Sequence, residues 1–565
     1  MNYYSLLLVF LAYWLFVRIL DRRGILSKYN ISAYGPVLML RTQRGQKFLD
    51  RLASRKSFWR VFASIGLPAM LIGMFVMFLL IVLVDINVIG LFQTQTVPPP
   101  SKFNEPRNFF LIPGINEYIP FEWGIIALII TLIVHEFSHA ILCKVEGIRV
   151  KSMGILLALI PIGGFAEPDE EQLLGKKEEK EGKERGPEEA LPGTPATRSQ
   201  RIRVLTAGVM ANFTTALVAF ILFFSLLGSI SPVGEVMVTS VIPGSPADQA
   251  GVKPNMIITG IDDKQVNSAE DFLIYASTIE PGSKVTLSVA DNRTRKVIDL
   301  VTGPDNRTRP GIKVYNIVEG SPAEAAGIKP DMVLIRINDT EIKRLDDFIS
   351  FMNSTRPGQT LDIYMMSNTS ANASMEVFRG IELTKYPYEA GAKKGFLGIS
   401  YSPDTGAVSY SLGIGIGEFQ AKRFLHMLQN IPSLLNKPDG WVYLFSLPII
   451  GLTGEGFPGF SGLITYFYEP AGWASSLGNG IFWMLNILMW VGWMNFYVGL
   501  FNCLPAVPLD GGHVFRDVMA GTLSRIIGNG ERVERISNAI VVIFAILILM
   551  SLVFVTFAPY AAHGF

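Results

Sequence analysis

The sequence predicts a polytopic α-helical membrane protein of about six transmembrane helices, with two small β-rich domains inserted between its core helices. Three observations support this fold class. Of the 565 residues, 49% are hydrophobic and only 17% are charged, which is a membrane-like composition. Six apolar stretches are long enough to cross a bilayer, which takes about 20 residues. A more polar region between two of these stretches contains an internal repeat.

The six predicted spans are Tyr4–Leu20, Ala63–Val84, Trp123–Cys143, Val204–Gly228, Phe482–Cys503 and Ile536–Phe557. The first has its arginines at or after its end, whereas a secretory signal has its positive charge before the apolar run. We therefore expect a retained anchor. A further apolar stretch, Trp441–Ile464, is interrupted by prolines and glycines, which predicts a re-entrant or interfacial segment.

Lysine and arginine predict the orientation of these spans. Asp21–Arg60 contains ten basic residues, whereas the next loop, Asp85–Glu122, contains two. Lys144–Arg203 is again basic-rich, with a Lys/Glu tract at Lys176–Glu189 that is typical of solvated, disordered chain. The chain is therefore expected to be an integral protein of the cell membrane, with its first, third and fifth loops on the cytoplasmic side. Both chain ends are expected outside.

The third predicted span contains the motif HEFSH. His135 and His139 lie about one helical turn apart on one face, where both imidazoles can bind one zinc ion. Glu136, beside the first histidine, has the chemistry of a general base toward a water molecule on that metal. Ionisable groups are costly in an apolar span and are usually functional. A chance match to three positions is therefore less favoured here than it is in a soluble helix.

A hydrolytic zinc site needs a third protein ligand and one open position. Cys143 continues the helical face of the two histidines, but it lies about 9 Å along the axis from their midpoint, too far for a Zn–S bond of about 2.3 Å. Asp510, in the segment NCLPAVPLDGG, is the better candidate. Pro505 and Pro508 prevent a regular helix there, and broken backbone near a membrane is tolerated where it lines a cavity. The alternative is a helix stop with a solvated aspartate.

The region after the fourth span repeats itself with an offset of 76 residues. PGSPADQAGVKPNMII, from Pro243, aligns with EGSPAEAAGIKPDMVL, from Glu319. Each copy predicts short strands around a small helix opened by Ser-Pro-Ala. The copies resemble PDZ domains, which bind an extended peptide as an added strand, and GFLGI at Gly395–Ile399 resembles their carboxylate-binding loop. Two roles stay open for this PDZ-like pair: it binds a peptide, or it filters substrates by size without binding one.

Six of the nine asparagines between Asn255 and Asn372 begin an N-x-S/T sequon. Such acceptors favour an exterior surface for the repeat. The two PDZ-like domains are therefore expected outside, and the histidine motif is expected near the cytoplasmic side.

The motifs HEFSH and NCLPAVPLDGG resemble the two signatures of the site-2 protease family of intramembrane zinc metalloproteases. The resemblance implies that Zn²⁺ is bound by His135, His139 and Asp510 and that Glu136 is catalytic. PIGGF at Pro161–Phe165 resembles the family's membrane-associated hairpin. The segment AGVMAN at Ala207–Asn212 resembles its G-x-x-x-N helix. The resemblance covers roughly 121–550.

The predicted domains follow from these features. A transmembrane pair with a basic loop covers 1–122 and the first half of the protease core covers 123–230. The PDZ-like domains cover 231–303 and 304–399. The interfacial segment covers 400–480, and the second half of the core covers 481–565.

The predicted function is cleavage of transmembrane segments of single-span membrane proteins within the lipid bilayer. Candidate substrate-binding residues are Asn502 and Asn212, whose alternative role is interhelical hydrogen bonding, and the strand that contains Gly163, Gly164 and Phe165. An exterior peptide or substrate tail is the expected partner of the PDZ-like domains, and no basic stripe suggests nucleic acid. Two other classes stay open, a non-proteolytic membrane scaffold and a zinc transporter.

Overall fold

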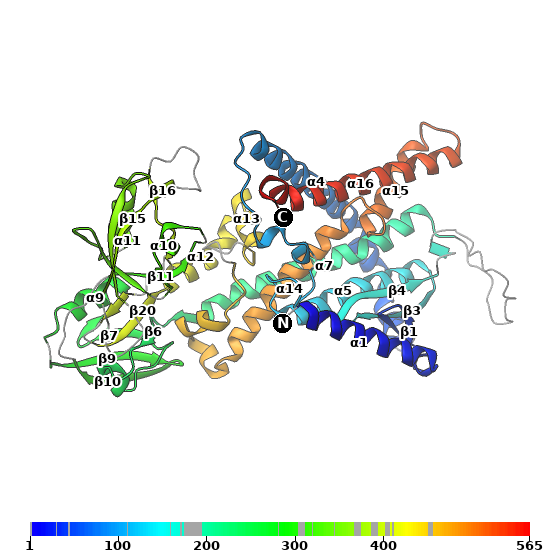
Figure 1. Cartoon of the computed structure of the whole chain (residues 1–565). Helices are drawn as coiled ribbons and strands as arrows, with labels where there is room; N and C mark the ends of the chain where they lie inside the picture. The colour runs from blue at the N-terminus through cyan, green and yellow to red at the C-terminus, as the bar shows by residue number, and fades with distance from the viewer. Residues whose placement is uncertain are drawn as a thin grey trace. The chain divides into compact units, whose positions relative to one another are not determined.

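A computed structural model describes most of the chain (Figure 1). The residues outside its description are 1–2, 30, 43–45, 110, 159, 170–171, 174–194, 281, 303–310, 319, 331, 344, 367–374, 386–393, 402–406, 410–411, 450–455 and 565. The Lys/Glu tract at 176–189 therefore lies outside the described residues. The same holds for part of the predicted interfacial segment.

The chain divides into two compact units. The first, which we call the membrane unit, comprises Met1–Ser225, Val442–Gly459 and Met484–Phe565. The second, the inserted unit, comprises Leu226–Trp441 and Phe460–Trp483. The inserted unit thus interrupts the membrane unit in the sequence.

Five helices among the described residues are long and apolar enough to cross a membrane. They are α4 (Lys56–Gln93), α5 (Phe121–Glu146), α7 (Arg198–Leu226), α14 (Gly480–Asn502) and α16 (Gly530–His563). Each coincides with one of the predicted spans to within two residues at the C-terminal end or contains it whole, which supports an integral membrane protein. The N-terminal helix α1 (Tyr3–Arg22) contains the other predicted span, so the count of six stays a prediction.

Shorter helices accompany these five in the membrane unit. They are α2 (Ile25–Lys28), α3 (Gln46–Ala53) and α15 (Asp510–Leu523), with the 3₁₀ turns η1 (Lys102–Asn104) and η2 (Pro106–Phe109). Helix α3 packs beside α5, and its buried Leu49 belongs to a core cluster that also contains Cys143. Cys143 is therefore a buried packing residue, as its distance from the histidines predicts.

Close helix packing in the membrane unit depends on glycines in α4. A Cβ at Gly66 would lie 3.1 Å from the carbonyl oxygen of Thr206 in α7, and a Cβ at Gly73 would lie 2.7 Å from Sγ of Cys503. The Thr206 hydroxyl donates to the Ala63 carbonyl at 3.0 Å. Small residues let membrane helices approach closely enough for such contacts. Helix α4, which the family resemblance leaves without a role, is therefore packed against core helix α7.

A four-stranded antiparallel sheet also belongs to the membrane unit. Its strand order is β1 (Ile31–Tyr34), β2 (Val37–Thr42), β3 (Val150–Ala158), β4 (Ile160–Pro168). The predicted hairpin at Pro161–Phe165 thus gains two strands from the N-terminal basic loop, through pairs such as Leu40 with Ile155. Strand β4 remains at the end of the sheet, where it is also packed against α5.

The inserted unit contains two β domains with the same order of elements. The first begins with β6 (Val236–Val241), α8 (Pro246–Gln249), β7 (Ile257–Ile261), β8 (Lys264–Gln265), α9 (Ala269–Ser277), β9 (Lys284–Asp291) and β10 (Thr294–Val301). The second begins with β11 (Ile312–Ile317), α10 (Pro322–Ala325), β12 (Val333–Ile337), β13 (Thr340–Glu341), α11 (Leu345–Ser354), β14 (Thr360–Met366) and β15 (Met375–Glu382). The repeated sequence therefore produces a repeated fold.

The two domains are nested rather than consecutive. The second ends with β16 (Thr384–Lys385), β17 (Gly395–Phe396) and β18 (Ile399–Tyr401), and β18 pairs with β11. The chain then returns to the first domain through β19 (Ala407–Ser409) and β20 (Ile414–Glu418), and β20 pairs with β6. The predicted first domain, 231–303, thus lacks two of its strands, and the predicted interfacial segment from 400 contains them. Ile414 and Ile416 belong to the same buried apolar cluster as Val236 and Val238. Burial of these side chains therefore stabilises the pairing of β20 with β6.

Each domain has a glycine loop against its Ser-Pro-Ala helix. Gly398 and Gly413 have positive φ angles of 86° and 77°, and a Cβ there would lie 2.0 Å from Cβ of Ser321 and 2.1 Å from Cβ of Ser245, respectively. The predicted carboxylate-binding loop, Gly395–Ile399, is one of these loops. Its counterpart, around Gly413, belongs to the first domain and was missed because it lies after the second domain in the sequence.

The remaining described elements precede or follow these domains in the sequence. They are η3 (Leu227–Ser229), β5 (Ile230–Pro232), α12 (Ala421–Leu434), α13 (Pro438–Ser446), η4 (Gly462–Phe467), β21 (Tyr468–Pro470) and η5 (Gly472–Leu477). Strand β21 pairs with β5, and the buried Tyr468 hydroxyl donates to the Ala421 carbonyl at 2.9 Å. The described sequon asparagines are Asn292 and Asn353, which are exposed, and Asn338, which is half-buried.

Candidate metal centre

The histidine motif lies in the second half of α5, which begins after Pro120 and ends at Gly147. Gly147 has a φ of 80°, and the amide of Ile148 donates to the Cys143 carbonyl at 2.7 Å, a helix end that favours glycine. The last residue of the helix, Glu146, is buried and pairs with Arg203 at 2.8 Å and Arg60 at 3.2 Å. These pairs connect the end of α5 to α7 and α4.

Asp510 is the first residue of α15. The segment after α14 contains Pro505 and Pro508 and folds back over the start of α15. A Cβ at Gly511 would lie 2.4 Å from the carbonyl oxygen of Cys503, and one at Gly512 would lie 2.5 Å from the carbonyl carbon of Ala506. The two glycines therefore permit the close backbone approach that the sequence predicts.

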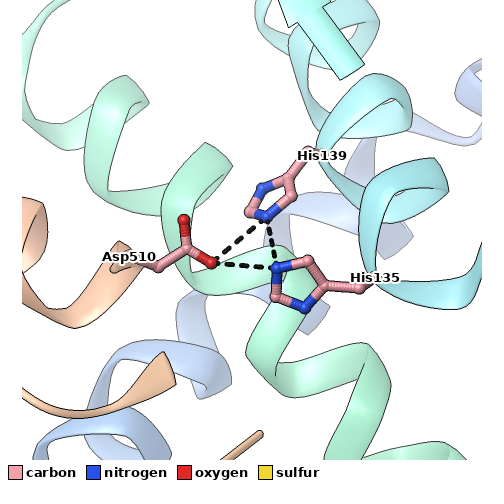
Figure 2. Close-up of side chains that lie close together, drawn as sticks. All are labelled: His135, His139 and Asp510. Carbon is pink, nitrogen blue, oxygen red and sulfur yellow. Dashed lines mark hydrogen bonds and ion pairs between the residues drawn. The ribbon is translucent and has the colours of Figure 1, made fainter. Parts of the chain in front are cut away.

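His135, His139 and Asp510 meet although 375 positions separate the first from the last (510 − 135). Nε2 of His135 and Nε2 of His139 are 3.1 Å apart, and each lies 3.2 Å from Oδ2 of Asp510 (Figure 2). Among the described residues, this is the one group of three or more histidine, cysteine, aspartate or glutamate side chains close enough to share a metal ion. Three atoms bound to one zinc at about 2.1 Å in tetrahedral geometry lie about 3.4 Å apart. The donor atoms therefore fit zinc.

Helix α7 supports both imidazoles. Nδ1 of His139 lies 2.8 Å from the Val204 carbonyl oxygen, so it donates and leaves the Nε2 lone pair for the cluster. At Gly208, a Cβ would lie 2.5 Å from Nε2 of His139 and 2.7 Å from Cε1 of His135. The glycine of the G-x-x-x-N motif is therefore what lets α7 pass directly beside the two histidines.

Asn212, the last residue of that motif, is fully buried beside His135. Its side-chain nitrogen lies 3.1 Å from Nδ1 of His135, and its side-chain oxygen has no hydrogen-bond partner among the described residues. Exchanging the two amide atoms by a half-turn of the side chain lets the oxygen accept from Nδ1–H. That arrangement satisfies the oxygen and leaves Nε2 of His135 available to a metal. The sequence left two roles open for Asn212, substrate binding and interhelical hydrogen bonding, and this contact between α7 and α5 is of the second kind.

The other predicted site residues are not among the three clustered donor groups. Glu136 is half-buried beside His135 on α5. The side-chain nitrogen of Asn502 donates to the Val498 carbonyl at 3.1 Å, one turn earlier in α14. Gly163, Gly164 and Phe165 lie on β4 opposite Leu156, Ile155 and Gly154 of β3. The Phe165 ring packs over Gly154, where a Cβ would lie 2.6 Å from the ring.

A bidentate ion pair fixes α15 against α7. Arg201 of α7 contacts the two carboxylate oxygens of Asp517 at 3.0 and 3.2 Å. Asp517 is buried and lies seven residues after Asp510 on α15. Because α7 also contacts both histidines, this pair connects the helix of the candidate aspartate ligand with the helix that holds the imidazoles. The sequence offers no local signal for it.

Comparison with known proteins identifies one family across most of the chain. The family model described as peptidase family M50 matches residues 123–548. A regulator of sigma E protease from Haemophilus influenzae is 25% identical over 452 residues, which cover 73% of this chain and 92% of that protein. An uncharacterized protein of Methanocaldococcus jannaschii is 30% identical over 296 residues, covering 52% and 69%. A candidate zinc metalloprotease of Clostridium perfringens is 27% identical over 225 residues, covering 37% and 62%.

Proposed function

Because the chain belongs to peptidase family M50, the site-2 protease family of membrane metalloproteases, we propose that it is an intramembrane zinc endopeptidase that cleaves transmembrane segments of other membrane proteins. The observation that carries the proposal is the set of three donor atoms 3.1–3.2 Å apart, two of them on a helix apolar enough to cross a membrane. Such buried ionisable groups are costly in a membrane without a metal or a partner.

We assign the metal ligands as Nε2 of His135, Nε2 of His139 and a carboxylate oxygen of Asp510. When bound, zinc supplies a Lewis acid that polarises the scissile carbonyl and acidifies a water molecule. Glu136 accepts the proton of the attacking water and then delivers it to the leaving amine. Asn212 and the Val204 carbonyl hold the imidazoles in the required tautomer, and Gly208 provides the space for them.

The substrate helix must be unwound before cleavage because a helix shields its peptide bonds. Strand β4 is the terminal strand of the described sheet, and terminal strands pair with extended peptides. We infer that the backbone of Gly163, Gly164 and Phe165 receives the unwound stretch. The Phe165 side chain packs within the sheet, so pairing here depends on the backbone. Asn502 is proposed to bind the substrate backbone through its side-chain oxygen.

The two β domains are proposed to be PDZ-like and to filter substrates by exterior size. In the first domain, β19 already pairs with β20 on the edge opposite β6, and β19 also contacts α9. The chain thus supplies its own added strand where a PDZ domain would bind a peptide. In the second domain, β18 ends the described sheet. The occupied edge supports filtering over gripping for the first domain.

We propose the orientation that the charged loops and sequons indicate, with the inserted unit outside and the metal centre near the cytoplasmic side. Cysteine labelling checks it. A cysteine at Ser283 should react with an impermeant maleimide added outside intact cells. Labelling only after the cells are opened would reverse the orientation.

Replacing Glu136 by glutamine tests the enzymatic proposal. Glutamine keeps the shape of the side chain but cannot accept the proton, so cleavage should fall about 10²–10⁴-fold while zinc stays bound. Purified protein with a transmembrane reporter substrate gives the rate, and elemental analysis gives the zinc content. Glu122→Gln, at the exposed start of the same helix, is the matched control. A Glu136→Gln protein that cleaves like the control contradicts the mechanism and favours a scaffold or a transporter.

A further inference from the structure

A cleft of about 550 Å³ lies within the membrane unit between α4, α7 and α15. It is separate from the metal cluster, none of whose three residues lines it. Its apolar wall includes Ala63 and Leu67 of α4, Ile202 of α7 and Val518 of α15. These residues lie near the start of α4 and α7, two of the helices long and apolar enough to cross a membrane.

The lining of the cleft is also strongly basic. Arg198, Arg203 and Arg525 contribute to it, and Asp517 is the only acidic side chain among the described lining residues. The carboxylate of Asp517 is already bound by both arms of Arg201, and Arg203 is bound to Glu146. Among the described lining residues, the charges of Arg198 and Arg525 therefore have no acidic counterpart.

Arg198 and Arg525 are both exposed, and neither side chain makes an ion pair or hydrogen bond within the described part of the chain. The Arg198 guanidinium lies over α15, where a Cβ at Gly521 would be 3.1 Å from its Nη1. Arg525 lies in the turn that follows the last residue of α15, Leu523, and also lines the cleft. Two guanidinium groups thus converge from different elements on one cleft, an arrangement that favours an anion with several acceptor oxygens.

We propose that this cleft binds the phosphate headgroup of an anionic phospholipid, with Arg198 and Arg525 on the phosphate. The apolar wall directly beside the arginines accommodates the glycerol and the first part of an acyl chain. Basic pockets between membrane helices bind such headgroups. Ser64 and Ser199 also line the cleft, and their hydroxyl groups can donate to the phosphate.

The cleft has a structural connection to the metal centre. It is formed by α15, which begins with Asp510, and by α7, whose Gly208 contacts both histidines. A headgroup that bridges Arg198 and Arg525 therefore crosslinks these two helices beside the Arg201–Asp517 pair. We expect the bound lipid to hold Asp510 in place. This consequence, unlike the binding itself, rests on the proposed function.

The binding test uses the full-length protein in nanodiscs of phosphatidylcholine with or without phosphatidylglycerol, followed by native mass spectrometry of the released protein. Wild-type protein should retain phosphatidylglycerol, and Arg198→Gln/Arg525→Gln should retain about tenfold less for each arginine removed. The double variant Arg51→Gln/Arg55→Gln removes the same charge from the basic loop outside the cleft, and it should retain lipid like the wild type.

Three outcomes would overturn the site. The first is equal retention of phosphatidylglycerol by the cleft variant and the wild type. The second is a loss of retention in the control variant as large as the loss in the cleft variant. The third is protection of the detergent-solubilised protein against heat by inorganic phosphate alone that equals the protection by phosphatidylglycerol. The last would assign the cleft to free phosphate. Zinc content distinguishes this proposal from the proposed function, because the cleft variant should keep its zinc in phosphatidylcholine. Lost lipid binding with zinc retained supports the cleft whether or not the protein cleaves any substrate.

Discussion

The membrane unit and the inserted unit bury their polar groups in different ways. In the membrane unit, buried charged groups meet in pairs or clusters from distant elements, such as Arg201 with Asp517 and the two histidines with Asp510. In the inserted unit, two core clusters of apolar side chains are enclosed by sheets whose backbone groups pair with one another. The described residues place the candidate chemistry in the first unit and the two repeated β domains in the second.

This difference teaches that the two units are separable in function. A change at the metal cluster leaves the β domains intact, because they have cores of their own. A change in the β domains is likewise expected to leave the donor atoms in place, because those atoms belong to the other unit. Zinc occupancy is therefore the measurement that distinguishes a change in the membrane unit from a change in the inserted unit. The largest effect on it is expected at the metal cluster, and the smallest in the β domains.

Replacing Asp510 by alanine should cause the largest loss of zinc, about 10²-fold or more in affinity, because it removes one of three proposed protein ligands. Zinc titration against a competing chelator measures the affinity. Asp517→Asn, on the same helix but outside the cluster, is the control and should lose less. An Asp510→Ala protein with wild-type affinity would place the third ligand elsewhere.

Replacing Gly208 by alanine should weaken zinc binding by about 10–100-fold, the size of effect typical of residues that support metal ligands. The new Cβ would lie 2.5 Å from Nε2 of His139, so α7 or the imidazoles must move. Gly228→Ala, where nothing lies within 4 Å of the new Cβ, should leave the affinity unchanged. Equal affinities in the two variants would show that α7 does not determine the positions of the histidines.

Deleting the β domains should have the smallest effect on zinc. Because the domains are nested, the deletion must run from Val236 to Glu418, which also removes β19 and β20. Its ends are adjacent, since the Phe419 amide donates to the Glu235 carbonyl at 2.9 Å, so a short glycine linker can join them. Zinc content should stay at the wild-type level. Loss of zinc in this variant would break the comparison between the units.

The same deletion decides between filtering and gripping. A filter predicts that the shortened protein gains cleavage of a substrate with a bulky exterior domain and keeps cleavage of a short-tailed one. Gripping predicts loss of both. Immunoblots of one long-tailed and one short-tailed substrate measure this, and long-tailed substrate left intact in the deletion variant would contradict the filter.

The sequence by itself determined the features that depend on neighbouring residues. The apolar runs predicted six membrane-spanning helices, and five helices among the described residues are long and apolar enough to be such spans. The HEFSH spacing predicted two histidines on one helical face, and the prolines and glycines around Asp510 predicted a broken segment before the aspartate. The offset of 76 residues predicted two similar β domains. Each of these follows from helical or strand periodicity and from local turn chemistry, which are readable without knowledge of the fold.

Only the tertiary structure decided which distant segments meet. It pairs β2 with β3, returns β19 and β20 to the first domain, and brings Arg198 next to α15. It also places the Asn212 side chain against His135, a specific contact that the sequence alone does not indicate. Such contacts depend on how apolar faces pack and on which small residues permit close approach. The order of residues along the chain does not show how apolar faces pack or which small residues permit close approach. Both depend on surfaces that exist only after folding.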